Sequence, residues 1–365
     1  MRKTDQINPT VIRLGGLCFF TLALMALIFY QQRSTMMDAA YQVFQIIVQE
    51  RPAIQVNRFG AIFTQIFPLF SVELGLSLQV VLISYSLAFV IYPTILFRII
   101  LRWIKQPTWA LTLPLFYVLM VSHTFYWIQS ELIQGLAFLL FYFACLEKDS
   151  VLKLQSLPLH FAALVLLVFF HPLLFIPLLY LWLFRLHGGF LKQWVYFTIP
   201  VFTLLILGFK HFWLGPNAYD SIAISRSQSL FENSGEFFSF ISTRRFFIWC
   251  FRDYYFFPIL FFYLVYFYGK NREFTKMGLL VLFTLAYIFL VNSTFRWGLP
   301  QFHMESFYQI LAVFVLVPFV MDILPGWEKN QQVGLIALVF CIRLLHIGLQ
   351  HQPYTQRLDW NENLI

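Results

Sequence analysis

The stretch LGGLCFFTLALMALIFYQQRSTMMDAAYQVFQIIVQERP, residues 14–52, holds the two patterns that decide the fold. Residues 14–30 form an apolar run near the length that crosses a bilayer as a helix. The segment that follows, residues 34–52, is amphipathic and carries one carboxylate, Asp38, near its start. The first pattern predicts a transmembrane helix and the second a helix on the membrane surface.

The composition of the whole chain agrees with a membrane location. Hydrophobic residues make up 60% of the 365 residues and charged residues only 12%, whereas soluble domains have roughly 45–50% apolar and about 25% charged residues. The four cysteines lie in apolar runs without the short spacings of metal or disulfide frameworks. No small-residue cleavage site follows the first apolar run, so we expect an uncleaved first span.

The apolar runs predict an all-α polytopic membrane protein that forms a single integral-membrane domain over residues 1–365. We expect about 11 transmembrane helices, within a range of 9–13, because several runs are shorter than a straight crossing requires. The runs cover residues 14–30, 76–97, 109–122, 132–146, 157–170, 172–186, 194–212, 246–268, 277–291, 307–324 and 333–349.

The distribution of basic residues sets the expected orientation. With a cytoplasmic N-terminus, 14 of the 25 basic residues fall on the cytoplasmic side and nine on the outer side, in keeping with the positive-inside rule. The long loops then lie outside, at residues 31–75, 213–245 and 292–306. We therefore expect the working face to be periplasmic, in a bacterial inner membrane. No continuous basic patch with interleaved aromatics indicates nucleic-acid binding.

The basic residues differ in type between the two sides. The expected outer set has eight arginines and one lysine, whereas the cytoplasmic set has six arginines and eight lysines. Arginine binds phosphate or carboxylate with a planar fork, while lysine acts as a point charge. The pattern indicates an anionic ligand outside, and the alternative is that the arginines pair with lipid headgroups and outer acids.

Two interfacial helices are expected in the first outer loop. Met37, Tyr41, Phe44 and Val48 recur at helical spacing, with polar residues on the opposite face. A second apolar segment, residues 57–70, is too short to cross the membrane. Asp38 lies in the first turn of the first helix, where a carboxylate also acts as a cap for free amide groups. Both capping and catalysis remain open for this residue.

The order of these features resembles the glycosyltransferase-C (GT-C) superfamily of integral-membrane enzymes. The shared features are a first span followed by an outer loop of two interfacial helices with an early acid. The segment at 122–148 resembles the family's short outer segment and following span, with Glu131 at its outer end. The His171-Pro172 pair resembles its span with a basic residue before proline, and Arg296 with Leu299-Pro300 matches its late outer loop.

The resemblance implies transfer of a sugar from a polyprenyl-phosphate-linked donor to a lipid, glycan or protein acceptor. Asp38 would remove the proton from the acceptor hydroxyl, and cationic groups would stabilise the departing phosphate. The implied substrate-binding residues are Arg58, Glu131, His171, Arg244, Arg245, Arg296, His303 and Glu305. The chain has Asp38-Ala39 where many relatives carry adjacent acids, and it contains no Asp-x-Asp. No metal or other cofactor is therefore indicated.

Simpler roles remain for several of these residues. His171 before a proline can be a polar turn residue, Glu131 can cap its helix, and Arg244-Arg245 can anchor a span at the headgroups. Three other functions also remain: a lipid-linked polysaccharide polymerase, a lipid or glycan transporter (flippase), and a non-catalytic assembly subunit. A transporter should show an internal repeat and ionisable groups near the midplane, for which Arg343 and Asp322 are the main candidates.

Overall fold

A computed structural model describes residues 7–128, 131–148, 154–187, 194–215, 221–222, 225 and 234–363. All regular elements within these ranges are helices. In the first half of the chain they are α1 (Pro9–Ile28), α2 (Tyr30–Ser34), α3 (Met37–Gln49), η1 (Phe59–Ala61), α4 (Ile62–Glu73), α5 (Leu78–Ile99), η2 (Ile100–Ile104), α6 (Pro107–Leu119), α7 (Glu131–Lys148), η3 (Leu154–Ser156), α8 (Leu157–Phe170), η4 (Pro172–Leu174) and α9 (Phe175–His187).

The second half of the chain continues the same architecture. Its elements are η5 (Trp194–Phe197), α10 (Thr198–Phe212), η6 (Ser234–Ser239), α12 (Ile241–Arg252), α13 (Phe256–Lys270), α14 (Phe274–Thr294), α15 (Gln301–Pro318), η7 (Phe319–Ile323), η8 (Leu324–Gly326), α16 (Lys329–Leu349) and α17 (Gln352–Glu362). Each of the eleven apolar runs of the sequence coincides with a helix or, for residues 246–268, with a broken helix pair.

Five helical segments of the described residues are long and apolar enough to cross a membrane: Pro9–Ile28, Leu78–Ile104, Phe274–Thr294, Gln301–Gly326 and Lys329–Asn361. A sixth crossing is possible if α12 and α13, which meet at a bend of 88°, count as one span. The helices α6, α8 and α10 have 13–15 residues, so each is only about 20–23 Å long. The length criterion thus supports five or six spans.

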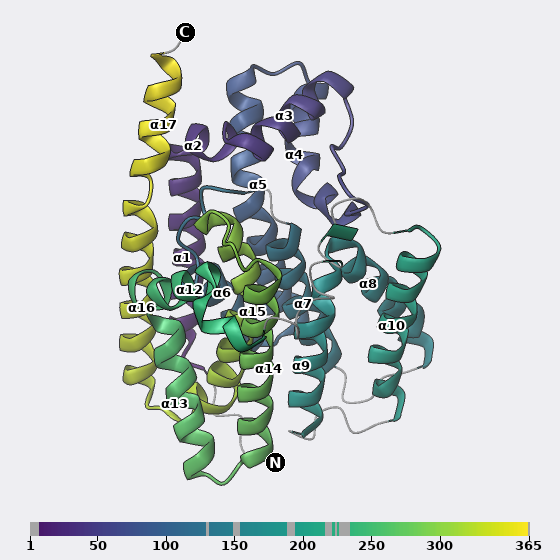
Figure 1. Cartoon of the computed structure of the whole chain (residues 1–365), viewed down its shortest axis with the longest axis vertical. Coiled ribbons are helices and arrows are strands. Elements are labelled where there is room, and N and C mark those ends of the chain that lie inside the picture. Colours follow the sequence, from purple (N-terminus) through teal and green to yellow (C-terminus); the bar gives the residue numbers. More distant parts are fainter. Residues whose placement is uncertain are drawn as a thin grey trace.

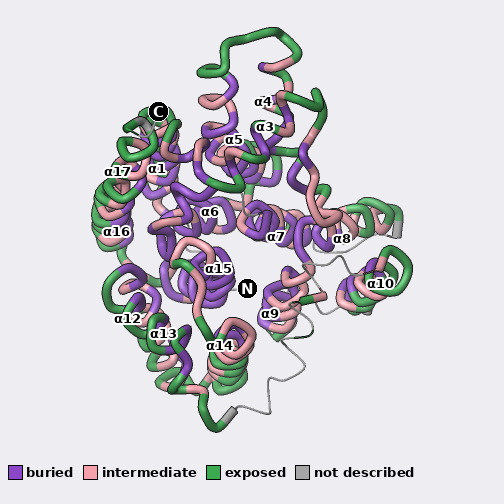
Figure 2. Tube along the Cα trace, turned by 45° about the horizontal axis from the view of Figure 1, so that its top comes forward, coloured by how far each residue is buried: buried purple, intermediate pink, exposed green. Residues whose placement is uncertain are grey.

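The core of the bundle is α15. In the span that contains it, 89% of the most apolar window is buried, against 22–56% in the other four. It packs against α6, α7, α9, α13 and α14, and Figure 2 shows it surrounded by helices whose outer sides are exposed. The position follows from packing and not from hydropathy alone, because α14 is similarly apolar but only 22% buried.

The segment predicted to be the first outer loop, residues 31–75, forms a helical layer at the top of the molecule as drawn in Figure 1, where α3 and α4 lie beside the upper part of α5. The predicted surface helix is α3, with Tyr41 and Val48 of its apolar stripe exposed at 54% and 61%. Its polar face packs against protein: Gln42 is buried and accepts hydrogen bonds from Tyr85 and Gln65. At the other end of the described chain, α17 reaches the top of the same view.

Candidate functional site

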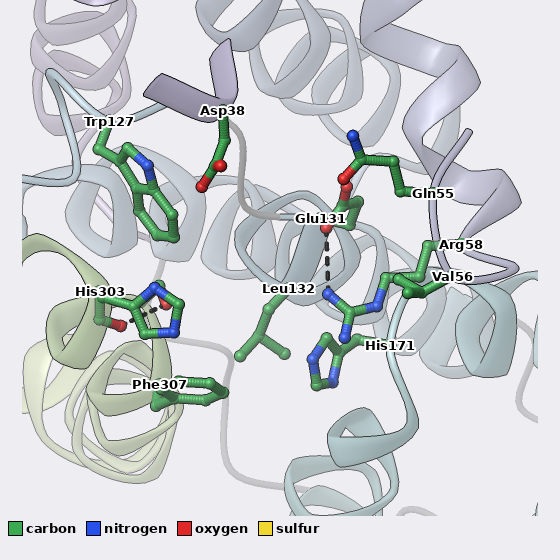
Figure 3. A pocket seen from close by; sticks show the side chains of 11 residues that line it. Asp38, Gln55, Val56, Arg58, Trp127, Glu131, Leu132, His171, His303 and Phe307 are labelled. Atoms are coloured by element: carbon green, nitrogen blue, oxygen red, sulfur yellow. Dashed lines mark hydrogen bonds and ion pairs between the residues drawn. The ribbon is translucent and has the colours of Figure 1, made fainter. Parts of the chain in front are cut away.

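A cavity of about 210 Å³ lies where the layer of α3, η1 and α4 meets the ends of three bundle helices. Figure 3 shows the side chains that line it. They come from the start of α3, the segment before η1, the start of α7, the break between α8 and η4, and the first turns of α15. The lining residues are Asp38, Gln55, Val56, Arg58, Trp127, Glu131, Leu132, His171, His303, Ser306 and Phe307.

Five of the nine site residues expected from the sequence therefore meet in one cavity, although they are spread along the chain from Asp38 to His303. The remaining four, Arg244, Arg245, Arg296 and Glu305, do not line it. The cavity takes residues from the predicted outer loops 31–75 and 292–306. Of the loop at 213–245, residues 216–220, 223–224 and 226–233 lie outside the described part of the chain.

An ion pair joins two sides of the cavity. Arg58 Nη1 lies 3.3 Å from Glu131 Oε2, and the two side chains are only 12% and 5% exposed. Burial raises the pKa of the Glu131 carboxyl above its ordinary value, and the positive charge of Arg58 opposes that shift. The pair fixes Arg58 beside α7, with its guanidinium on the cavity wall (Figure 3).

His171 occupies the break between two helical segments. Its Nδ1 accepts a hydrogen bond from the backbone N–H of Leu173 at 3.1 Å, which is the first amide available after Pro172. The neutral ring therefore carries its proton on Nε2. Burial, followed by the positive charges of Arg58 and Lys210, lowers the pKa of His171 well below its usual range. His171 is thus a neutral side chain that offers one N–H donor.

Two glycines set the position of this histidine. A Cβ on Gly60 would lie 2.2 Å from the ring of Phe170, and a Cβ on Gly135 would lie 2.8 Å from Phe170 Cβ. Both approaches are closer than real Cβ contacts, so only glycine allows η1 and α7 to pack this tightly on the end of α8. The close packing brings His171 to the same cavity as Arg58 and Glu131.

Asp38 is the second carboxylate of the cavity. It lies in the first turn of α3, but the N-cap is Met36, which has no side-chain cap. Over the described ranges of the chain, the Asp38 carboxylate makes no hydrogen bond or ion pair. Figure 3 shows it pointing towards the space between Trp127 and Glu131. The helix dipole still favours an acid here, but a hydrogen-bonded cap does not account for it.

An aromatic wall faces the ion pair across the cavity. The rings of Trp127 and His303 are tilted with centroids 5.1 Å apart, and His303 also contacts Phe307 at 5.5 Å. Trp127, which is 5% exposed, was not predicted from the sequence, because aromatic residues near the ends of apolar runs commonly form an interfacial belt. Gln55 and Ser306 were also missed, since no periodicity or motif marks them.

Glu305 is fully buried outside the cavity and has a different environment. Its carboxylate accepts hydrogen bonds from the backbone N–H groups of Ser122, His123 and Thr124 at 2.6–3.2 Å. The hydroxyls of Thr124 and Tyr254 also donate to it, at 2.5 and 3.1 Å. Glu305 therefore holds the segment that carries Trp127 against α15.

The three remaining arginines gather elsewhere. Arg244 and Arg245 are exposed in the first turn of α12, and Arg296 is exposed in the loop after α14. Arg296 lines a separate cavity of about 240 Å³ formed by residues 293–299.

Within the described ranges, no group of three or more His, Cys, Asp and Glu side chains is arranged to hold a metal ion. Comparisons of the chain with protein-family models, with curated proteins and with solved structures found no match.

Proposed function

We propose that this chain is a membrane glycosyltransferase of GT-C type that transfers a sugar from a polyprenyl-phosphate-linked donor to a lipid, glycan or protein acceptor. The observation that carries the proposal is the cavity that combines an unpartnered carboxylate, Asp38, with a buried Arg58–Glu131 pair and a neutral histidine. These are the group types that an inverting transfer from a sugar phosphate needs.

The proposed roles follow from the chemistry of each group. Asp38 accepts the proton of the acceptor hydroxyl as the acceptor oxygen bonds to the anomeric carbon. The bond from that carbon to the phosphate oxygen breaks, and the leaving lipid phosphate takes the electron pair. Arg58 and the Nε2–H of His171 stabilise the new phosphate charge, and Glu131 orients Arg58.

The volume of the cavity favours a small group. Ligand pockets for drug-sized molecules measure about 300–1,000 Å³, while this cavity measures about 210 Å³. It suits one sugar ring beside Trp127 and Phe307. The chain of a carrier lipid would lie outside it.

The two ionisable groups that a transporter would use, Arg343 and Asp322, already have hydrogen-bond or ion-pair partners within the protein. Arg343 of α16 donates to the carbonyl oxygens of Val118, Val121 and Asp253 at 2.6–2.8 Å. Asp322 accepts from Tyr268 and pairs with Lys276 at 2.7 Å. Because both side chains are held by protein groups, neither is available to bind a transported ion or substrate. This favours transfer over transport as the function of the chain.

The proposed topology completes this account. α6, α7, α8, α9, α10 and α13 would cross with the five spans that meet the length criterion to give eleven, with the N-terminus cytoplasmic. The cavity would then open to the periplasm of a bacterial inner membrane.

The proposal is tested with purified protein in vesicles that contain a panel of polyprenyl-phosphate-linked sugars, by measuring release of the polyprenyl phosphate with acceptors present. The variant R58Q/E131Q removes the guanidinium without leaving a buried carboxylate unpaired, and should reduce release by about 100-fold or more. The variant R51Q alters an exposed arginine of the same loop and should retain activity. No release by the wild type with any donor, or equal release by both variants, would contradict the proposal.

A further inference from the structure

The exposed arginines that do not reach the cavity form a second cluster, defined here as the arginine cluster of Arg244, Arg245 and Arg296. Within the described ranges, none of the three makes an ion pair. Arg252, on the same helix, differs because it pairs with Asp253 at 2.9 Å. The arginine cluster therefore carries positive charge that the described acids leave uncompensated.

The loop after α14 and the start of α12 are in direct contact. The backbone N–H of Ser242 points to the carbonyl oxygen of Arg296 at 3.4 Å. Arg245 Nη1 lies 3.2 Å from the position that a Cβ would take on Gly298, whose φ of +73° favours glycine. This contact places the side chain of Arg245 against the loop that carries Arg296.

The cavity at this loop has about 240 Å³ of space. Arg296 lines it, with its guanidinium 5.3 Å from the centre of the Trp297 ring. Trp297 is 74% exposed. Arg245 does not line this cavity, but its Nη1 lies beside Gly298, which does. An anion held at this loop would compensate the positive charges of both arginines. A phosphate group fits this position because each arginine can donate two parallel hydrogen bonds to its oxygens.

The orientation of α12 indicates where this anion comes from. Because α12 makes an angle of 88° with α13, it lies along the bilayer surface when α13 crosses the bilayer. Its Phe247, Ile248 and Phe251 are exposed at 46–80%, as expected for a face that contacts acyl chains. Figure 2 shows α12 at the rim of the bundle; its buried side packs on α15 through Phe246 and Tyr308, and it contributes no residue to the first cavity. Trp297 supplies an aromatic ring at the same headgroup level.

We propose that the arginine cluster binds the phosphate of an anionic bilayer phospholipid, at a site separate from the Asp38 cavity. Arg245 and Arg296 bind the phosphate oxygens, and Arg244 adds positive charge beside them. The acyl chains lie along the exposed apolar face of α12. The site fixes the position of α12 at the membrane surface, and its occupancy does not depend on the transferase proposal.

The test measures lipid retained by the purified protein with native mass spectrometry, after exchange into detergent with either phosphatidylglycerol or phosphatidylcholine. The wild type should retain phosphatidylglycerol with at least about tenfold preference. R245Q/R296Q should lose that preference, R245K/R296K should retain part of it, and R51Q should behave as the wild type. Unfolding temperatures of all variants show that each is folded.

Three results would overturn the proposal. Equal retention of the two lipids by the wild type would show that the protein does not select anionic lipids. An unchanged preference in folded R245Q/R296Q would show that these arginines do not form the site. Displacement of the phospholipid by millimolar inorganic phosphate would identify the ligand as a soluble anion. Stronger retention of undecaprenyl phosphate than of phosphatidylglycerol would assign the site to the carrier lipid.

Discussion

Charged side chains in this chain differ in burial and in the groups that satisfy them. Glu305, Arg343 and Arg33 are fully buried, and each makes three or more hydrogen bonds to protein groups. Asp38 is exposed instead and makes no hydrogen bond or ion pair over the described ranges, and it lines the cavity that also holds the Arg58–Glu131 ion pair. A buried charge with a full set of partners stabilises the fold, whereas an exposed carboxylate at a cavity is available to a ligand.

The hydrogen bonds of Glu305 predict that its replacement lowers the stability of the fold. Replacing Glu305 by Gln replaces an acceptor-only carboxylate by an amide whose N–H₂ group faces N–H and O–H donors. The free energy of unfolding should fall by ~2 kcal/mol or more. Thermal unfolding in detergent measures the loss, with E50Q, an exposed acid of α3's C-terminal end, as the matched control. An unfolding temperature equal to that of the wild type would contradict a structural role for Glu305.

His171 predicts how stability depends on pH. Its pKa is lowered in the folded protein, so the unfolded chain takes up a proton at this residue while the folded chain does not. The contribution is present above the unfolded pKa of about 6.5 and is lost as pH falls below it, by at most ~1.4 kcal/mol per pH unit for one proton. H171N keeps a side-chain acceptor for Leu173 but cannot titrate. Unfolding curves from pH 7.5 to 5.5 should therefore be flatter for H171N, and parallel curves would contradict this assignment.

Two helix breaks shape the bundle, and the first of them carries a cavity residue, His171. His171 ends α8 in an extended conformation before η4, and α12 turns sharply into α13. The sequence predicted the first break from Pro172 but not the second, because residues 246–268 read as one continuous apolar run. Tyr254 and Asp253 are buried there, and their polar contacts to Glu305, Arg343 and Gln301 stabilise the break. These long-range contacts leave no periodic signal in the sequence.

Close packing at Gly135 gives a prediction at the level of the element. G135A would place a methyl group 2.4 Å from Leu174 Cδ1 and 2.8 Å from Phe170 Cβ. The flexible leucine can move, but the Phe170 position is set by its backbone, so we expect a loss of about 1–3 kcal/mol in stability and a displaced His171. The control G278A lies on α14 with no atom within 4 Å and should be neutral or stabilising. Equal unfolding temperatures and activities for the two variants would be inconsistent with this packing.

At the scale of the whole molecule, the sequence predicted the helical class, the position of every apolar helix and two helices in the first outer loop. Through the resemblance to the GT-C superfamily it also singled out five residues that meet in one cavity. It did not separate these from Arg244, Arg245, Arg296 and Glu305, which the same resemblance implied and which do not line the cavity. Lateral packing decides which helix ends face one another, and a one-dimensional pattern contains no information on it.

The proposed topology predicts which residues an impermeant thiol reagent can reach. In a cysteine-free background, Q49C at the end of α3 should react in intact cells because it would face the periplasm. N271C, in the turn between α13 and α14, should react only after the membrane is permeabilised. Both native residues are exposed, so access to solvent does not distinguish them. Labelling of N271C in intact cells together with protection of Q49C would reverse the orientation.

In the proposed mechanism, Asp38 removes the proton of the acceptor hydroxyl in the transfer step. The most direct measurement is the single-turnover rate of sugar transfer from pre-bound polyprenyl-phosphate-linked donor, for the wild type, D38N and E50Q. If Asp38 is the base, D38N should bind donor normally but transfer the sugar at least ~100-fold more slowly, while E50Q should match the wild type. A D38N rate close to that of the wild type, with donor bound, would contradict it.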